Sequence, residues 1–421
     1  MSRIPNHLSI LLALLVGISC QSGDRLPDPA PVVKTGAAVL VESDFAVLEG
    51  KRVGLIANQT TRYQDQHLVD VLRAHEGLSL TAIFGPEHGY RGDVEAGQKV
   101  DSDSLDAIPV YSLYGDTRAP TPDMLENVDV LVFDIQDIGA RFYTYISVLG
   151  LAMQSAANAG IEFVVLDRPN PLGGNYIGGP LVESGNESFV GLYPIPIAHG
   201  LTVGELAQMI AGERWIEGLE DLQLTVVEII GWQRSDGWPF DPQHWIPTSP
   251  NIPTVQTAVV YSGICLLEAT ALNEGRGTDE PFLIFGAPEV DAQSVVELLN
   301  DASLPGAEFS MQTYTPRSIP GVAASPKHQD VTINGVRLTL LDADIYRPVE
   351  TGVHVLTAIR DASPDSYLEN TINERWMVLL SGSDELRRSL LAGESAREIL
   401  AGWQDQVESF QTQREPYLLY R

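Results

Sequence analysis

Carboxyl groups directly follow apolar runs at two places in the first third of the sequence. Glu87 and the adjacent His88 come after the run that ends at Phe84, and Asp137 follows a run that contains Asp134. Cleavage of a glycosidic bond usually takes two carboxyl groups. One is protonated to assist the leaving oxygen, and the other is ionised to act as nucleophile or to activate water. Carboxyl groups in these positions are candidates for acid–base catalysis, of which hydrolysis of a sugar linkage is one kind.

Glu87 is the first candidate for the general acid. It lies in a turn bounded by glycine and proline, where it could reach a cleft while partly desolvated, and such surroundings suit a carboxylic acid. His88 beside it is a further catalytic candidate. The alternative for Glu87 is a structural ion pair with Arg91 or Arg141.

Three other carboxyl groups, those of Asp134, Asp137 and Glu274, compete for the second catalytic role. Asp134 could instead hold Arg141 or a backbone turn, and Glu274 could hold Arg276. The sequence leaves this choice open.

Polar side chains near these carboxyl groups and in later loops are candidates for binding a substrate. They are Arg91, Gln136, Arg141, Tyr143, Asp167, Arg168, Asn170, His199, Asn251 and Arg276. Asp167 could instead shape its own loop, and the arginines could simply pair with neighbouring carboxylates.

The elements that must position these residues alternate between strand and helix. Strands are predicted at residues 52–57, 78–84, 128–135 and 162–166, and helices at 145–159 and from a capping box at Thr202 to Ile210. Such alternation is typical of an α/β fold with a doubly wound parallel sheet, and ligands of such sheets bind outside the carboxyl ends of the strands. A long loop over a cleft is expected at 231–253.

The pattern changes after about residue 285. A helix is predicted at 292–302, a β-hairpin at 331–338 around Asn334-Gly335, and another helix at 352–361. We therefore expect a main domain at 37–285 and a smaller α+β domain at 286–421.

The first twenty residues have the pattern of an export signal. Arg3 precedes an apolar run at 8–18, and residues 16–20 resemble a bacterial lipobox that ends at Cys20. We expect a signal peptide at 1–19, a lipid on Cys20 and a tether at 20–36, with the protein anchored to the cell envelope outside the cytoplasm. The alternative is a plain secretory signal with an incidental cysteine.

Charge and missing motifs exclude several function classes. The 26 Lys and Arg against 56 Asp and Glu give a formal charge of −30, which argues against nucleic acid as a partner. The sequence has no H-E-x-x-H, G-x-S-x-G or dinucleotide fingerprint, and His88, His199 and Asp134 could hold a metal only if the fold gathered them. We expect neither a metal nor a cofactor.

Several long motifs in one order resemble a family of bacterial exo-acting β-N-acetylmuramidases, formerly known only as an uncharacterised domain. They include residues 85–93, 189–196, 199–206 and 417–420, and the resemblance covers nearly the whole chain after the signal. It implies a Rossmann-like N-terminal domain, a smaller C-terminal domain with a cleft between them, and release of terminal N-acetylmuramic acid from peptidoglycan fragments. The rival hypothesis is a non-catalytic lipoprotein that binds the same sugars.

The implied sugar carries a lactyl carboxylate, so selectivity would need a local cation in a very acidic chain. Arginine suits this role because its planar guanidinium can bind a carboxylate through two parallel hydrogen bonds. Among the candidate arginines, Arg91 and Arg276 are our first choices.

Overall fold

The structure is a computed structural model that describes Met1, residues 32–92, 94–95 and 98, and residues 103–421. The predicted signal peptide, Cys20 and nearly all of the predicted tether lie outside the described residues, apart from Met1 and residues 32–36. Among the described residues, no helix is both long and apolar enough to cross a membrane.

A seven-stranded sheet organises the first part of the chain, with the strand order β5-β6-β4-β1-β7-β8-β9. Its strands are β1 (Arg52–Ala57), β4 (Ser79–Gly85), β5 (Asp103–Leu105), β6 (Ile108–Ser112), β7 (Val130–Asp134), β8 (Glu162–Leu166) and β9 (Leu224–Val227). All neighbours pair in parallel except the edge strand β5. The six parallel strands follow the 3-2-1-4-5-6 order of Rossmann-like folds, which confirms the predicted fold class.

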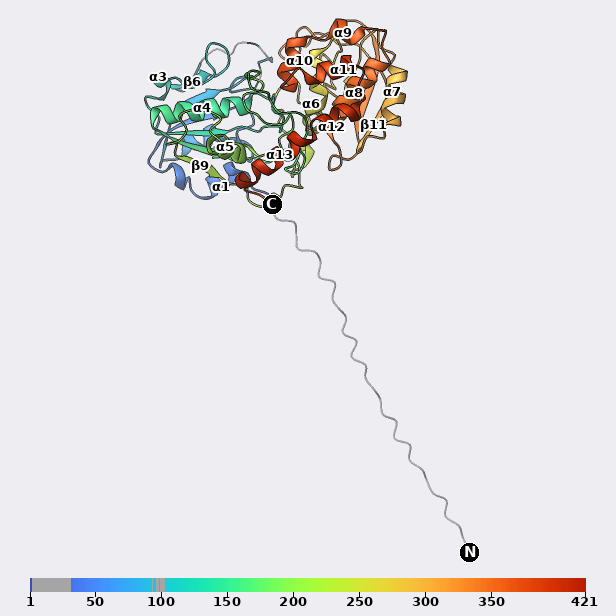
Figure 1. Ribbon diagram of the computed structural model, residues 1–421. Coiled ribbons are helices and arrows are strands. Elements are labelled where there is room, and N and C mark those ends of the chain that lie inside the picture. The colour runs from blue at the N-terminus through green and yellow to red at the C-terminus, as the bar shows by residue number, and fades with distance from the viewer. Residues whose placement is uncertain (2–31, 93, 96–97, 99–102) are drawn as a thin grey trace. The chain divides into compact units, whose positions relative to one another are not determined.

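Helices cover both faces of this sheet (Figure 1). On one face, α1 (Gly36–Glu42) and α2 (Leu68–Ala74) pack against Val53 and Leu55 of β1. On the other face, α4 (Tyr145–Ala159) and α5 (Val203–Gly212) join the cluster that contains Ile56. Because successive strand residues point to opposite faces, these runs are apolar throughout, as strands buried on both sides must be.

Both helices predicted beside the sheet are confirmed. α4 ends at Gly160, which adopts a left-handed conformation with φ of 67°, and α5 opens with the complete capping box of Thr202 and Glu205.

The strand order reverses between β1 and β7, which are neighbours although α2, β4 and β6 separate them in sequence. Connections on the two sides of such a switch point run in opposite directions, which leaves a crevice at the carboxyl ends of the strands. Residues after β1, β4 and β7 therefore meet at one edge of the sheet.

A second, antiparallel sheet has the order β10-β12-β11, with β10 (Ile284–Phe285), β11 (Ala307–Tyr314) and β12 (Ile333–Leu340). The hairpin predicted around Asn334-Gly335 is wrong, since both residues lie inside β12 and pair with Thr313 and Gln312. A Cβ atom at Gly335 would lie 2.5 Å from the carbonyl oxygen of Phe285, so glycine is needed there for close approach of β10.

The rest of the chain is mostly helical. The remaining elements are η1 (Ala46–Leu48), β2 (Arg62–Tyr63), β3 (Gln66–His67), α3 (Pro122–Leu125), η2 (Pro242–His244), α6 (Val255–Ile264), η3 (Cys265–Ala269), α7 (Ala292–Asp301), α8 (Pro348–Asp361), α9 (Tyr367–Thr371), α10 (Glu374–Ser381), α11 (Glu385–Leu391), α12 (Ala396–Gly402), α13 (Gln404–Arg414) and η4 (Glu415–Tyr417). The predicted helices at 292–302 and 352–361 correspond to α7 and α8. After α13 the chain returns to the first sheet, where Tyr417 donates a 2.8 Å hydrogen bond to Glu213 beside α5.

Candidate active site

Glu87 lies two residues beyond β4, half-buried at the carboxyl edge of the sheet. The hydroxyl of Thr144 donates a 2.7 Å hydrogen bond to Oε2 of Glu87. The Tyr114 hydroxyl lies beside the same carboxylate, and burial together with the negative charge of Glu87 raises the pKa of Tyr114. Thr144 directly precedes α4, so Glu87 also lies at the positive end of a 15-residue helix.

Two further tyrosines line this region, and both are tied to Thr248. Tyr143 donates to the Thr248 hydroxyl at 2.7 Å, and Tyr145 donates to its carbonyl oxygen at 2.6 Å. Their rings meet edge to face with centroids 4.9 Å apart. Burial raises the pKa of both tyrosines, and the charge of Glu87 adds to this effect. Both hydroxyls therefore stay protonated and hold the 248 loop near Glu87.

His88 is a buried support for the Glu87 turn. It adopts a left-handed conformation with φ of 70°, and its Nδ1 lies 2.6 Å from the carbonyl oxygen of Val94. A carbonyl only accepts, so Nδ1 carries the proton. Burial lowers the pKa of His88, and Arg276 acts in the same direction against the opposing charge of Glu87. A neutral His88 thus fixes the backbone next to Glu87.

Asp134 forms a buried ion pair with Arg168. The alternative pairing with Arg141 is therefore wrong. The Arg168 guanidinium donates two hydrogen bonds, of 2.6 and 2.9 Å, to the two carboxylate oxygens. Asp134 is fully buried, and the Arg168 guanidinium neutralises its charge through these two hydrogen bonds. The pair links the ends of β7 and β8, which makes both residues structural here.

Asp137 and His199 form a second buried pair, with Oδ2 and Nε2 3.9 Å apart. Asp137 accepts a 2.7 Å hydrogen bond from the Gly139 amide, while its Oδ1 and the Nε2 of His199 have no hydrogen-bond partner among the described residues. Burial raises the pKa of Asp137 to about 7 and lowers that of His199 to about 3. His199 is therefore neutral, and neither group is open to solvent.

Glu274 lies between two cations, with its oxygens 3.3 Å from Arg276 and 3.1 Å from Lys327. Arg276 also donates to Glu268 at 2.7 Å and stacks 5.1 Å from the centre of the Phe282 ring. Although burial opposes it, the charges of Glu268 and Glu274 raise the pKa of Arg276. Glu274 is thus an ion-pair partner of Arg276, which was the alternative to a catalytic role in the sequence analysis.

Five predicted sugar-binding residues are buried and make structural contacts, and their role in binding stays a prediction. The members are Gln136, Arg141, Asp167, Asn170 and Asn251. The Arg141 guanidinium donates to the carbonyl oxygens of Pro180, Ile195 and Leu380, at 2.6 to 2.8 Å. Such a group joins three segments of the backbone and has no open edge for a sugar.

Asp167 shows the same kind of structural use. Its carboxylate accepts hydrogen bonds from the hydroxyls of Thr202 and Tyr420 and from the amides of Arg168 and Gly204. Burial raises the pKa of Asp167 to about 7 even against these donors. This carboxylate joins α5 to the C-terminus of the chain.

The amides of the other three buried residues bind backbone oxygens. Gln136 donates to Asp137 and Pro169, Asn170 to Leu201, and Asn251 to Val322. Arg91, in contrast, is exposed in the turn after Glu87. Of the predicted residues, the structure therefore gathers Glu87, His88, Tyr143 and Arg276 in one region.

Several residues of this region had not been predicted. They are Asn58, Thr60 and Thr61 directly after β1, and Tyr114, Arg118, Thr144 and Thr248. The amide of Gln136 donates to the Thr60 hydroxyl at 3.0 Å, which joins the ends of β1 and β7 at the switch point. Residues 58–61 directly follow an apolar run, as the predicted polar turns do. This position could have identified them from the sequence.

Among the residues that the structure describes, no group of three His, Cys, Asp or Glu side chains could hold a metal ion. His88, His199 and Asp134, which a metal site would have required together, do not form such a group.

Comparison with known proteins agrees with this architecture. The N-terminal model of the exo-β-N-acetylmuramidase NamZ family matches residues 53–256, and the C-terminal model of the same family matches 259–420.

Individual relatives match over almost their full length. The chain is 42% identical over 393 residues to the peptidoglycan β-N-acetylmuramidase NamZ of Bacillus subtilis, covering 93% of this chain and 92% of that protein. Two crystal structures of DUF1343 family proteins from Bacteroides fragilis match with TM-scores of 0.83 and 0.76 at 38% and 33% identity. They cover 92% and 93% of this chain and 99% of each relative. The chain belongs to the NamZ family of exo-β-N-acetylmuramidases.

Proposed function

We propose that this protein is an exo-acting glycoside hydrolase that releases terminal β-linked N-acetylmuramic acid from peptidoglycan fragments during cell-wall turnover. The observation that carries the proposal is the position of Glu87, a half-buried carboxylate held by Thr144 at the carboxyl edge of a Rossmann-like sheet. The match of both family models supports it, as does the named activity of the Bacillus subtilis relative.

Glu87 is half-buried, whereas the other three candidate carboxyl groups are buried. Asp134 and Glu274 are engaged in ion pairs, and the unpaired oxygen of Asp137 is closed from solvent. As general acid, Glu87 would donate a proton to the leaving glycosidic oxygen. The Thr144 hydroxyl holds this carboxylate, and His88 fixes the backbone beside it.

Turnover of a chromogenic β-N-acetylmuramide tests the proposal. The enzyme hypothesis predicts release of the chromophore by the wild-type protein and its loss in Glu87→Gln. The rival, a non-catalytic murein-binding lipoprotein, predicts that muropeptides bind without hydrolysis. Binding with no turnover would therefore reject the enzyme proposal.

We also propose that the mature chain is lipid-anchored through Cys20 and faces an extracytoplasmic compartment, the periplasm or the outer membrane in a Gram-negative cell. The pattern of residues 16–20 supports this, together with a substrate that lies outside the cytoplasm. Mass spectrometry of the mature N-terminus tests it. A free Cys20, or cleavage at another position, would remove the anchor.

A further inference from the structure

We infer that Arg118 binds the lactyl carboxylate of the terminal N-acetylmuramic acid and so selects this sugar over N-acetylglucosamine. This inference rests on the proposed function. The lactyl group is ionised near neutral pH, whereas the chain carries a formal charge of −30. A bound anion therefore needs a local cation that is not already neutralised.

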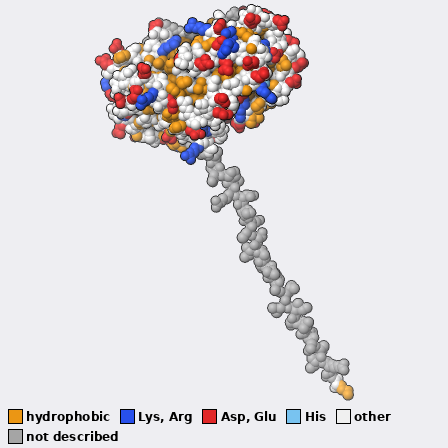
Figure 2. Space-filling view, viewed as in Figure 1, with side chains coloured by type: hydrophobic (Ala, Val, Ile, Leu, Met, Phe, Trp, Pro, Cys, Tyr) orange, Lys and Arg blue, Asp and Glu red, His pale blue; other side chains and the backbone are white. Residues whose placement is uncertain are grey.

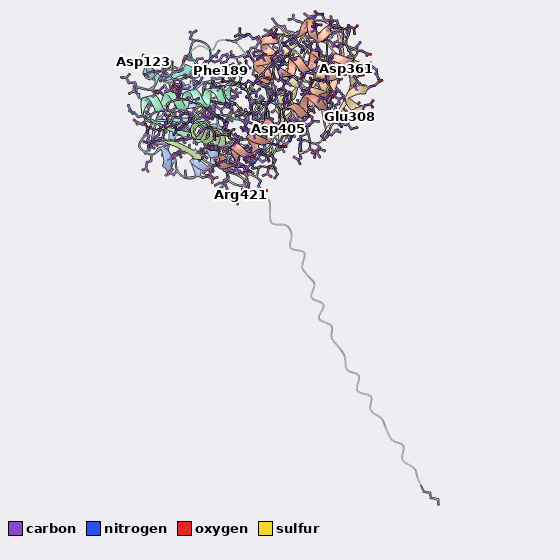
Figure 3. The ribbon with its side chains drawn as sticks, viewed as in Figure 1. Asp123, Phe189, Glu308, Asp361, Asp405 and Arg421 are labelled. Atoms are coloured by element: carbon purple, nitrogen blue, oxygen red, sulfur yellow. The ribbon has the colours of Figure 1, made fainter. Side chains whose placement is uncertain are left out.

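Arg118 is connected to the Glu87 region through the ring of Phe189. Its guanidinium carbon is 4.3 Å from the centre of the Phe189 ring, and that ring lies 6.2 Å from the ring of Tyr114. The Tyr114 hydroxyl lies beside Glu87, and the charge of Arg118 acts on this same hydroxyl. A cation and the candidate catalytic carboxylate thus both lie close enough to Tyr114 to act on its hydroxyl. Figure 3 labels Phe189 within this part of the molecule.

Two other arginines near the site are already neutralised. Arg168 is paired with Asp134, and Arg276 is held between Glu268 and Glu274. Arg276, one of the two arginines preferred from the sequence, is partly exposed. Its ion cluster has no surplus positive charge that could attract an anion.

Arg118 is exposed and forms no ion pair with any residue in the described part of the chain. The other exposed candidate is Arg91, whose charge lowers the pKa of Tyr90. The charges of Asp70 and Arg73 also influence that pKa, and the Tyr90 ring packs against His67. Arg91 is thus coupled to the α2 side of the turn, whereas Arg118 is coupled to Tyr114.

Stacking also orders Arg118 for this task. A guanidinium that lies over a ring keeps its N–H groups free at its edge, where a carboxylate can accept two parallel hydrogen bonds. A side chain that is already ordered loses less conformational entropy when it binds. Phe189 is therefore a positioning residue for Arg118.

The test compares a chromogenic β-N-acetylmuramide with its lactyl methyl ester, which has nearly the same shape and no charge. In the wild-type protein we expect a lower KM for the acid. Arg118→Gln should raise the KM for the acid by about 10- to 100-fold, with a much smaller change for the ester. Arg118→Lys should restore part of the preference, because it keeps the charge but not the fork.

Arg347→Gln is the matched control. The Arg347 guanidinium carbon lies 5.5 Å from the centre of the Tyr176 ring, and the group donates to the carbonyl oxygens of Asp344 and Tyr346. Its loss should leave both substrates unaffected. Equal effects of Arg118→Gln on acid and ester, or no effect on either, would overturn the inference. Absence of turnover in the wild-type protein would instead reject the proposed function.

Discussion

Thr144 and Glu87, 57 residues apart in sequence, are joined by a 2.7 Å hydrogen bond between the threonine hydroxyl and the glutamate Oε2. The bond places the carboxylate at the N-terminus of α4, where unpaired backbone amides and the helix dipole favour negative charge. At this position Glu87 has two candidate roles, the general acid predicted from the sequence and the nucleophile or base. The two roles differ in their dependence on the leaving group.

Glu87→Gln should lower turnover of peptidoglycan fragments by about 10²- to 10⁴-fold, the usual contribution of a positioned acid or base. If Glu87 is the general acid, substrates with activated aryl leaving groups should lose much less, since they need no proton. Steady-state rates on both substrate types measure the difference. Equal losses at unchanged thermal stability would assign Glu87 as nucleophile or base, and no loss on either would leave it a structural residue.

The sequence predicted the four central strands and the polar turns after them because both depend on local pattern. Strands at 52–57 and 162–166 agree with β1 and β8 to the residue. Since the carboxyl ends of parallel strands share one edge, the position of Glu87 followed from the fold class alone. Tyr114 was missed because it follows the peripheral strand β6, which was not predicted.

Charge pairs between segments far apart in sequence could not be predicted, because their partners meet only through tertiary packing. Asp134 pairs with Arg168, 34 residues away, and Arg141 binds the carbonyl oxygen of Leu380, 239 residues away. The Asn334-Gly335 dipeptide has a strong local preference for a turn, and this preference is overridden by strand pairing on both sides. Side-chain burial, rather than sequence spacing, distinguishes the half-buried Glu87 from the buried carboxyl groups of Asp134, Asp137 and Glu274.

Asp134→Asn should destabilise the protein by about 3 to 5 kcal/mol, since it leaves the buried Arg168 guanidinium without a counter-charge. Chemical denaturation measures the change in the free energy of unfolding. Glu42→Gln is the matched control, because the Lys34–Glu42 pair is exposed, with side-chain exposures of 38% and 45%. That substitution should cost less than about 1 kcal/mol. Similar costs for the two variants would contradict the structural role of Asp134.

Tyr420→Phe should destabilise the chain by about 1 to 3 kcal/mol. The Tyr420 hydroxyl donates to Asp167 at 2.6 Å and accepts from the Ile229 amide at 2.9 Å, so its loss leaves buried groups unpaired at the C-terminus. Tyr63→Phe, in the two-residue strand β2, is a control with a half-exposed ring. A Tyr420→Phe protein as stable as the control would show that the C-terminus is not held in this way.

Acidic and basic side chains are interspersed over the face shown in Figure 2, so the pH dependence of stability includes many surface charges. Comparison of a single buried carboxyl with a matched exposed one removes this background. Asp137 is suited to such a comparison because burial raises its pKa to about 7, well above the value of about 3.9 in an unfolded chain.

Between pH 4 and 7 the folded protein keeps the Asp137 proton and the unfolded chain releases it. The contribution of this group to stability is therefore greatest below about pH 4, falls as pH rises to 7, and is constant above that, with a total change on the order of 4 kcal/mol. Asp137→Asn removes this titration, so its stability relative to wild type should improve steadily from pH 4 to 7 in urea unfolding. Asp123→Asn, at an exposed position labelled in Figure 3, should show no such trend. A constant difference between wild type and Asp137→Asn across this range would mean that Asp137 is ionised in the folded protein, with the neighbouring His199 charged to balance it.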